Sequence, residues 1–130
     1  LVMAGGNAEW TGRELPDGVQ GGLLTSDDIS HLDLSSTRLV AMSACETGCG
    51  QATNDGLYGL QRAFKKAGAQ TLVMSLWQMS DIVSKEFMIA FFNNLPASGW
   101  DKRTAFNKAK TAIREAYPDP FYWAGIIMTD

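Results

Sequence analysis

Two apolar runs separated by a helical pattern constrain the fold of this chain more than any other feature. Leu39–Ala44 and Gln70–Trp77 contain no charged residue and have the length of strands that are covered on both faces of a sheet. Between them, Asp55–Ala67 carries apolar residues at helical spacing, and Gly68 supplies a stop signal. The pattern predicts a strand, an amphipathic helix and a second strand.

The remaining carboxyl-terminal sequence continues this alternation. Ser80 and Asp81 begin a second helix that is expected to end at Pro96, and Asp101 can cap a third. The expected apolar face of the second helix comprises Val83, Phe87, Phe91 and Leu95. The expected stripe of the third comprises Ala105, Ala109, Ala112 and Ala116, flanked by Phe106 and Ile113. Phe121–Met128 is expected to form a last strand, so the fold class is α/β, a mainly parallel sheet with helices on both faces.

The amino-terminal part is less regular. Leu1–Gly5 resembles the end of a strand, and Asn7–Gly22 is rich in Gly, Pro and charged residues without a sustained period, which predicts a loop. Thr25 precedes two aspartates and has the character of a helix start, so a short helix is expected from there to about Leu32. Because the chain opens in mid-strand without an initiator methionine, we expect it to be part of a longer protein.

Composition excludes several classes of function. The chain has 130 residues, of which 45% are hydrophobic, and this is enough for one domain. A net charge of −3 with scattered lysines argues against nucleic-acid binding, and no apolar run approaches the length of a membrane span. The two cysteines cannot form a disulfide framework or, with one histidine, a zinc site. We therefore expect no metal or cofactor, and a reducing, cytoplasmic location.

The strand at Leu39–Ala44 leads directly into Cys45 and a turn that contains Gly48. A small nucleophilic side chain at the carboxyl end of a parallel strand lies where α/β proteins place reactive groups. A catalytic cysteine needs a base, however, and the only histidine, His31, precedes the strand. We expect His31 to be exposed and near the opposite edge of the sheet from Cys45.

Three motifs carry a family resemblance. They are SACETG at Ser43–Gly48, GLYGLQRAFKKAGAQTLVMSLWQMSD at Gly56–Asp81 and FYWAGIIMTD at Phe121–Asp130. By these motifs the chain resembles the C-terminal part of a CHAT domain, a caspase-like cysteine peptidase related to separase and often fused to tetratricopeptide repeats. The resemblance implies that residues 1–130 form the C-terminal portion of one such domain, with a caspase-like sheet whose first strand or strands precede Leu1.

The resemblance also implies a chemistry. Cys45 aligns with the catalytic cysteine, which attacks the scissile carbonyl while its own backbone N–H donates to the oxyanion. The family's histidine, followed by glycine, would lie upstream of Leu1, so this chain is expected to be a cysteine endopeptidase fragment that is inactive alone. Cys49 stands where the family usually has an apolar residue, and is read as a loop cysteine.

Substrate-binding residues follow from the same resemblance. Ser75 and Trp77 end a strand whose edge would pair with extended substrate backbone, and Gln78 and Asp81 would lie at the mouth of the pocket. Asp81 aligns with an acidic residue that in separase-like relatives faces a basic substrate side chain, although it also suits an ordinary helix start. Glu46 either favours a basic residue as well or caps the turn. The residues do not separate these alternatives.

A second hypothesis is a non-catalytic module, a pseudo-peptidase that binds peptides or partner proteins. A metal-dependent hydrolase is disfavoured because the carboxylates are dispersed. The expected partners are a peptide or protein substrate and the tetratricopeptide-repeat region of the parent chain, without nucleic acid or membrane. A missing strand would leave a sheet edge unpaired, which favours homo-oligomers.

Overall fold

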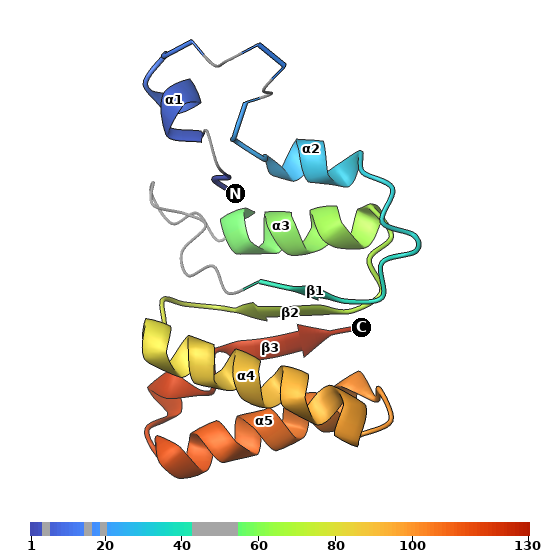
Figure 1. The fold of residues 1–130 in the computed structure, drawn as a ribbon, viewed down its shortest axis with the longest axis vertical. Coiled ribbons are helices and arrows are strands. Elements are labelled where there is room, and N and C mark those ends of the chain that lie inside the picture. Colours follow the sequence, from blue (N-terminus) through green and yellow to red (C-terminus); the bar gives the residue numbers. More distant parts are fainter. Residues whose placement is uncertain (4–5, 15–16, 19–20, 43–54) are drawn as a thin grey trace.

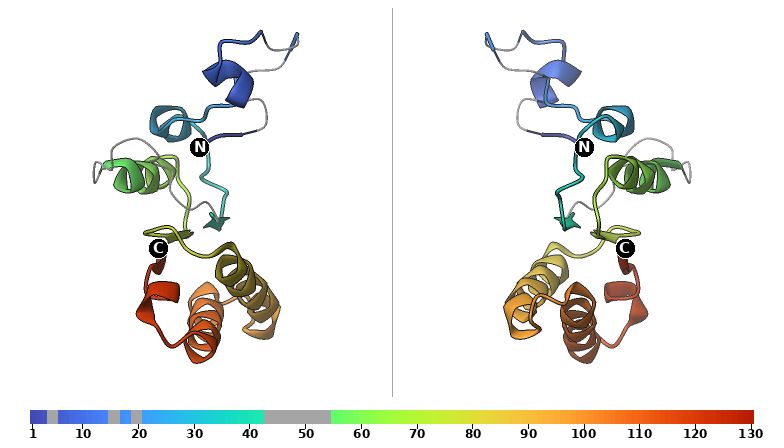
Figure 2. Two further views of the ribbon diagram at one scale, coloured as in Figure 1. Left: turned by 90° about the vertical axis from the view of Figure 1, so that its left-hand side faces the viewer. Right: turned by 90° about the vertical axis from the view of Figure 1, so that its right-hand side faces the viewer.

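A small sheet lies between two groups of helices. The structure, a computed structural model, describes residues 1–3, 6–14, 17–18, 21–42 and 55–130. Helices α2 (Ser26–Ser30) and α3 (Asp55–Lys66) lie on one side of the sheet, whereas α4 (Asp81–Ala97) and α5 (Lys102–Ala116) lie on the other (Figures 1 and 2). The described residues therefore form an α/β fold with helices on both faces, as the sequence predicts.

The described sheet has three strands in the order β1 (Val40–Ala41), β2 (Leu72–Ser75) and β3 (Ile126–Thr129). β1 is parallel to β2, and the Met42 amide just beyond β1 donates to the Val73 carbonyl at 2.8 Å. β3 is antiparallel to β2. Of the two described pairings, only one is therefore parallel, so the sheet is mixed where a mainly parallel one was expected.

The number of helices between strands explains these directions. One helix, α3, connects β1 to β2 and returns the chain to the end of the sheet where β1 began, so β2 is parallel to β1 (Figure 1). Two helices, α4 and α5, connect β2 to β3, and the second helix brings the chain back to the end where β2 finished. β3 must then run in the opposite direction.

The face of the sheet toward α4 and α5 carries the larger core. Val73, Ile126 and Met128 point into it from the strands. The helices contribute the expected face of α4 together with a group from α5, namely Val83, Phe87, Phe91, Leu95, Ala105, Phe106, Ala109 and Ile113. The Phe87 and Phe106 rings meet edge to face, with centroids 5.5 Å apart, a favoured aromatic geometry.

The opposite face of β2 packs under α2 and α3. Leu72 is fully buried there with Ile29 from α2, and with Leu60 and Phe64 from α3. Because successive side chains of a strand point to opposite faces, Leu72 and Val73 enter different cores. β2 is thus covered on both faces, as its uninterrupted apolar sequence predicts.

Helix α2 has the capping arrangement that the sequence suggested. The Thr25 hydroxyl accepts from the Asp28 amide at 3.1 Å, while the Asp28 carboxylate accepts from the Thr25 amide at 2.8 Å. The Thr25 hydroxyl also donates to the Asp28 carboxylate at 2.6 Å, and this bond, together with that from the Thr25 amide, holds the pKa of Asp28 below its usual value. The helix ends at Ser30, slightly before the expected end near Leu32.

Three expectations about the second half need correction. Helix α4 continues through Pro96 to Ala97, because a proline in the last turn removes only one donor near the end of the helix. Ala112 and Ala116 are exposed, since α5 packs mainly against α4 and turns Phe106 and Ile113 inward with Ala105 and Ala109. Only the first two alanines of the expected stripe are therefore buried.

The last strand is also shorter than expected. Asp119 caps a 3₁₀ helix, η1 (Pro120–Tyr122), by accepting from the Phe121 amide at 2.9 Å, and β3 begins only at Ile126. At the other end of the chain, the expected strand at Leu1–Gly5 is represented among described residues by one bridge between Val2 and Leu23. A short helix, α1 (Gly6–Trp10), lies within the predicted loop.

We predict that Phe91→Ala lowers the free energy of unfolding by about 3–5 kcal/mol, because Phe91 is 0% exposed between Phe87 and Phe106. Phe92→Ala is the matched control on the same turn of α4, since its ring is 49% exposed, and should cost less than about 1 kcal/mol. Urea unfolding of both variants measures the difference. Equal losses would contradict the described core.

Candidate functional site at the carboxyl ends of β1 and β2

The carboxyl ends of β1 and β2 meet at one edge of the sheet, beside the first turn of α4 (Figure 1). This edge holds Met42, just beyond β1, and Ser75, the last residue of β2. Cys45 and Glu46, which follow Met42 by three and four residues, lie outside the described residues, as does Cys49. The described part of the site is therefore the β2–α4 connection and the residues packed around it.

Trp77, in the β2–α4 connection, contacts residues of η1 and the segment before β3. Its indole Nε1 donates to the Phe121 carbonyl at 3.0 Å, and its ring stacks on the Phe121 ring with centroids 6.3 Å apart and an interplanar angle of 25°. The indole also lies against Gly125, where a Cβ atom would come within 2.5 Å of Trp77 Cε2. Trp77 is thus held by η1 and the start of β3, and only part of its surface remains accessible.

The backbone beside Trp77 is partly occupied. The Leu76 amide donates to the Gly125 carbonyl at 2.9 Å, which extends the β2–β3 pairing by one residue. Ser75 is half-buried, and the side chains of Leu76 and Phe121 are 40% and 52% exposed. The side of this segment that faces β3 is therefore closed to another strand, and an added strand would need the side that faces β1.

The two polar candidates, Gln78 and Asp81, are both exposed. Asp81 begins α4, where a carboxylate suits the helix dipole, while the preceding Ser80 makes no side-chain capping bond. The structure therefore brings Ser75, Trp77, Gln78 and Asp81 to one edge, at the end of β2 and the start of α4. Glu46 lies outside the described residues, so both of its expected roles, favouring a basic substrate residue or capping the turn, remain predictions.

Methionines fill the space under this edge, which the sequence interpretation missed. A cavity of only about 10 Å³ remains there. Its lining comprises Met42, Met74, Ser75, Met79, Ser84, Phe87, Met88 and Ile126. Such a volume holds about one water molecule at most, so the described residues form no ready-made substrate pocket at this point. The signal in the sequence was the repeated methionine on both sides of the expected strand end, and methionine adapts readily to a new neighbour.

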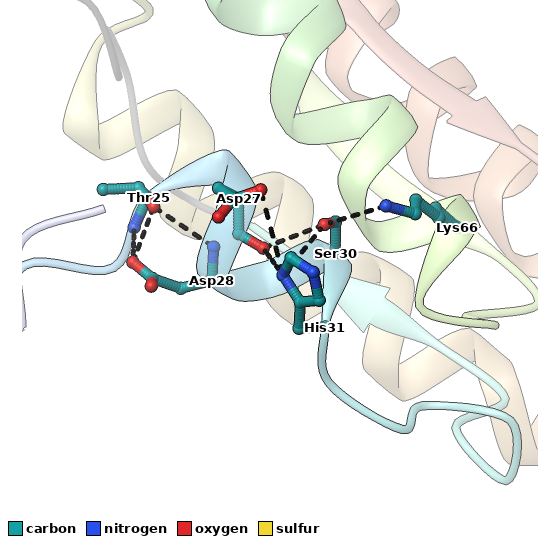
Figure 3. A network of polar contacts seen from close by, with 6 residues as sticks. All are labelled: Thr25, Asp27, Asp28, Ser30, His31 and Lys66. Carbon is teal, nitrogen blue, oxygen red and sulfur yellow. Dashed lines mark hydrogen bonds and ion pairs between the residues drawn. The ribbon is translucent and has the colours of Figure 1, made fainter.

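His31 lies at the far end of α2 from this edge. α2 ends on the side of the molecule where β1 begins, opposite the side where β1 and β2 end (Figure 1). The His31 Nδ1 atom is 2.8 Å from the Asp27 carbonyl and 3.8 Å from the Asp27 carboxylate, and the ring is exposed (Figure 3). Ser30 stands between His31 and the Lys66 ammonium. The prediction of an exposed histidine is confirmed, and its contacts belong to the end of α2.

The described part of the chain contains neither a cluster of metal ligands nor a helix that could span a membrane. Over those residues, no three His, Cys, Asp or Glu side chains come together in a way that would hold a metal ion. None of the helices described there has the length and apolar character that a bilayer crossing requires.

The described residues define a class of protein, an α/β domain in which a parallel pair of strands ends at one edge of the sheet. Comparison with known families identifies it further: the CHAT domain family matches residues 1–129. The chain belongs to the CHAT domain family. The resemblance inferred from SACETG and the two later motifs is thereby confirmed.

Two curated relatives are similar over most of the chain. Tetratricopeptide repeat protein 28 of Mus musculus is 35% identical over 108 residues, and that of Homo sapiens is 33% identical over 108 residues. Each match covers 82% of this chain but only 4% of the relative, so the chain spans a small part of the length of these proteins. Their names support the expected association of this domain with tetratricopeptide repeats. No solved structure matches the chain.

We predict that Gly125→Ala displaces the Trp77 indole, because the added Cβ would overlap the ring, and so breaks its hydrogen bond to Phe121. The Trp77 indole N–H resonance should move toward the position of a solvent-exposed tryptophan in NMR spectra. Gly59→Ala is the control, since its Cβ would meet only the Ser26 hydroxyl at 3.4 Å. An unchanged Trp77 resonance in Gly125→Ala would refute the described packing.

Proposed function

We propose that this chain is the nucleophile-bearing part of a cysteine endopeptidase domain, and that Cys45 is the nucleophile. The observation that supports the proposal is the parallel pairing of β1 with β2, which continues to Met42 at the carboxyl edge, the residue that SACETG follows in the sequence. Three residues separate Met42 from Cys45, and three residues span at most about 11 Å. Membership of the CHAT domain family supports a peptidase-related role.

The proposed reaction is acyl transfer to sulfur. The Cys45 thiolate attacks the scissile carbonyl, the tetrahedral oxyanion is stabilised by backbone N–H groups, and collapse breaks the peptide C–N bond to give a thioester. The amine leaves with a proton from an acid, and water then hydrolyses the thioester to release the acid product and the thiol. A histidine upstream of Leu1 is the proposed acid and base.

His31 does not serve as that base in this proposal. It caps the end of α2, which lies on the side of the molecule where β1 begins, whereas the reaction is proposed at the other end of the strand. Loss of a general base and of an oxyanion donor each costs on the order of a hundredfold in rate or more. The 130-residue chain alone is therefore expected to show no measurable peptidase activity.

Substrate recognition is proposed at the β2–α4 connection. An extended peptide would pair on the side of Ser75 and Leu76 that faces β1, since the Leu76 amide is already bonded to Gly125. The exposed parts of Leu76 and Trp77 would contact apolar substrate groups, and Gln78 would contribute polar contacts. Asp81 and Glu46 would favour a basic substrate residue, because both are carboxylates, Asp81 at the start of α4 and Glu46 next to Cys45 in the sequence.

A non-catalytic module that binds peptides at the same edge is the second candidate. The nearly filled space beneath Ser75 favours it, because a peptide recognised along the sheet edge needs no deep pocket. The two candidates differ in one respect: a binding module holds peptides intact, whereas a peptidase cleaves them. The protein-interaction setting suggested by the names of the relatives is compatible with both.

The test uses a protein that carries this chain together with the sequence preceding it in its gene, assayed on a peptide library. We predict that Cys45→Ala lowers turnover at least about a hundredfold, because the nucleophile is lost. Cys49→Ala is the matched control and should leave turnover within about twofold of the wild type.

Two outcomes separate the candidates. Equal turnover by Cys45→Ala and the wild type would remove Cys45 from the reaction and end the peptidase proposal. Peptides bound tightly but returned uncleaved by the wild type would support the binding module instead. A thiol titration of the unfolded chain confirms that each variant lacks only the intended cysteine.

A further inference from the structure

Helix α5 has a charge opposite to that of the rest of the chain. Five of the chain's 11 Lys and Arg residues lie within its 15 residues, against one acid, Glu115. α5 therefore contributes +4 to the net charge of −3, and the rest of the chain contributes −7. Because α4 covers the inner face of α5, Lys108 and Arg114 are exposed, Lys102 and Arg103 lie at its amino end, and Lys110 is half-buried beside β3. Such a separation of charge on one surface favours an anionic partner.

Two of these cations are positioned over one aromatic ring. The Lys110 ammonium is 5.9 Å from the centroid of the Trp123 ring, and the Arg114 guanidinium carbon is also 5.9 Å from it. Lys110 is further fixed by donating to the Ile126 carbonyl at 2.8 Å. The two cations are four residues apart on α5, so they stand side by side despite their like charge.

Among the described residues, no acid forms an ion pair with either of these two cations. Within the part of the chain that the structure describes, neither Lys110 nor Arg114 lies within salt-bridge distance of a carboxylate. Lys110 is also partly desolvated, and this burial lowers its pKa. An anion placed beside the two side chains would offset both the mutual repulsion and the desolvation.

The cations border a hollow that is large enough for a side chain. A cavity of about 230 Å³ is lined by Asn107, Lys110, Thr111, Arg114 and Trp123. We name these five residues the Trp123 groove. A second hollow of about 400 Å³ adjoins it, since Asn107 and Thr111 line both. Its other lining residues are Thr104, Lys108, Ala112 and the acidic Glu115, so the positive surface is centred on the first hollow. The Asn107 amide and the Thr111 hydroxyl add neutral hydrogen-bonding groups between the two.

We propose that the Trp123 groove is a docking site for an acidic polypeptide segment, with carboxylates bound by Lys110 and Arg114. Residues four apart on a helix are separated by about 6 Å along its axis, and alternate residues of an extended peptide by about 6.7 Å. Glutamates at alternate positions of an extended segment therefore match the spacing of the two cations. This site is distinct from the carboxyl edge of β1 and β2, and its test does not depend on Cys45.

An acidic peptide fits this site better than a nucleic acid does, because the residues outside α5 carry a net negative charge. A long polyanion that follows α5 would also meet the field of the rest of the chain, which carries −7. A short acidic segment of a protein requires only the local positive surface. The indole of Trp123 is also already covered by the two cations, which leaves it poorly suited for stacking with a base.

The test is titration of the 130-residue chain with a blocked peptide of about eight residues in which Glu and Thr alternate. A peptide with Gln in place of Glu serves as the uncharged comparison. We predict that the acidic peptide binds at least about tenfold more tightly, shifts the Trp123 indole resonance and loses affinity between about 50 and 500 mM salt. Arg114→Gln should weaken binding about fivefold, and Arg114→Glu should weaken it more.

The matched control is Arg62→Gln, an exposed arginine on α3 on the other side of the sheet, which should bind as the wild type does. Both arginines are exposed, so neither replacement disturbs a core, and circular dichroism checks that the helices remain. Equal affinity for the Glu and Gln peptides would overturn the proposal, as would unchanged binding by Arg114→Gln. Tighter binding of a single-stranded oligonucleotide of the same charge would assign the groove to nucleic acid instead.

Discussion

The structure depends on one strand, β2, that is buried on both faces and paired on both edges. Leu72 enters the core under α2 and α3, and Val73 enters the core with α4 and α5, so consecutive apolar residues of one strand organise both helical layers. β1 and β3 attach to its two edges. A single polar replacement in this strand would leave an unsatisfied group in one of the two cores, which explains why its sequence is free of charge.

The connections of β2 also determine where chemistry can occur. The single crossover through α3 aligns β1 with β2, so the two strands end at the same edge, and the pair of helices before β3 makes that strand run back from it. β1 ends at this edge, and the β2–α4 connection with Trp77 begins there. The Trp123 groove belongs to another surface, the outer side of α5, so catalysis and docking are assigned to separate parts of one domain.

Much of the fold follows from local sequence patterns. The face of α4 was predicted residue by residue because Val83, Phe87, Phe91 and Leu95 keep one helical period, and the caps at Thr25 and Asp101 use side chains beside their own helix. The predictions were wrong where burial or secondary structure depends on packing against residues outside the local sequence pattern. Ala112 is exposed because α4, and not the sheet, covers α5. Phe121 was predicted to begin a strand, but it lies in η1, which Asp119 caps. The contact of Trp77 with Gly125 joins residues 48 positions apart, which no local pattern reveals.

The central claim is that the edge where β1 and β2 end presents Cys45 as an activated thiolate once the upstream sequence is present. Its most direct test is covalent labelling of the longer protein with a peptide that bears a thiol-reactive group, followed by mass mapping of both cysteines. The account predicts rapid labelling of Cys45, slowed by competing peptide, and slow labelling of Cys49 at the rate of a free thiol. Labelling of Cys45 no faster than of Cys49, or no faster than in the unfolded protein, would contradict it.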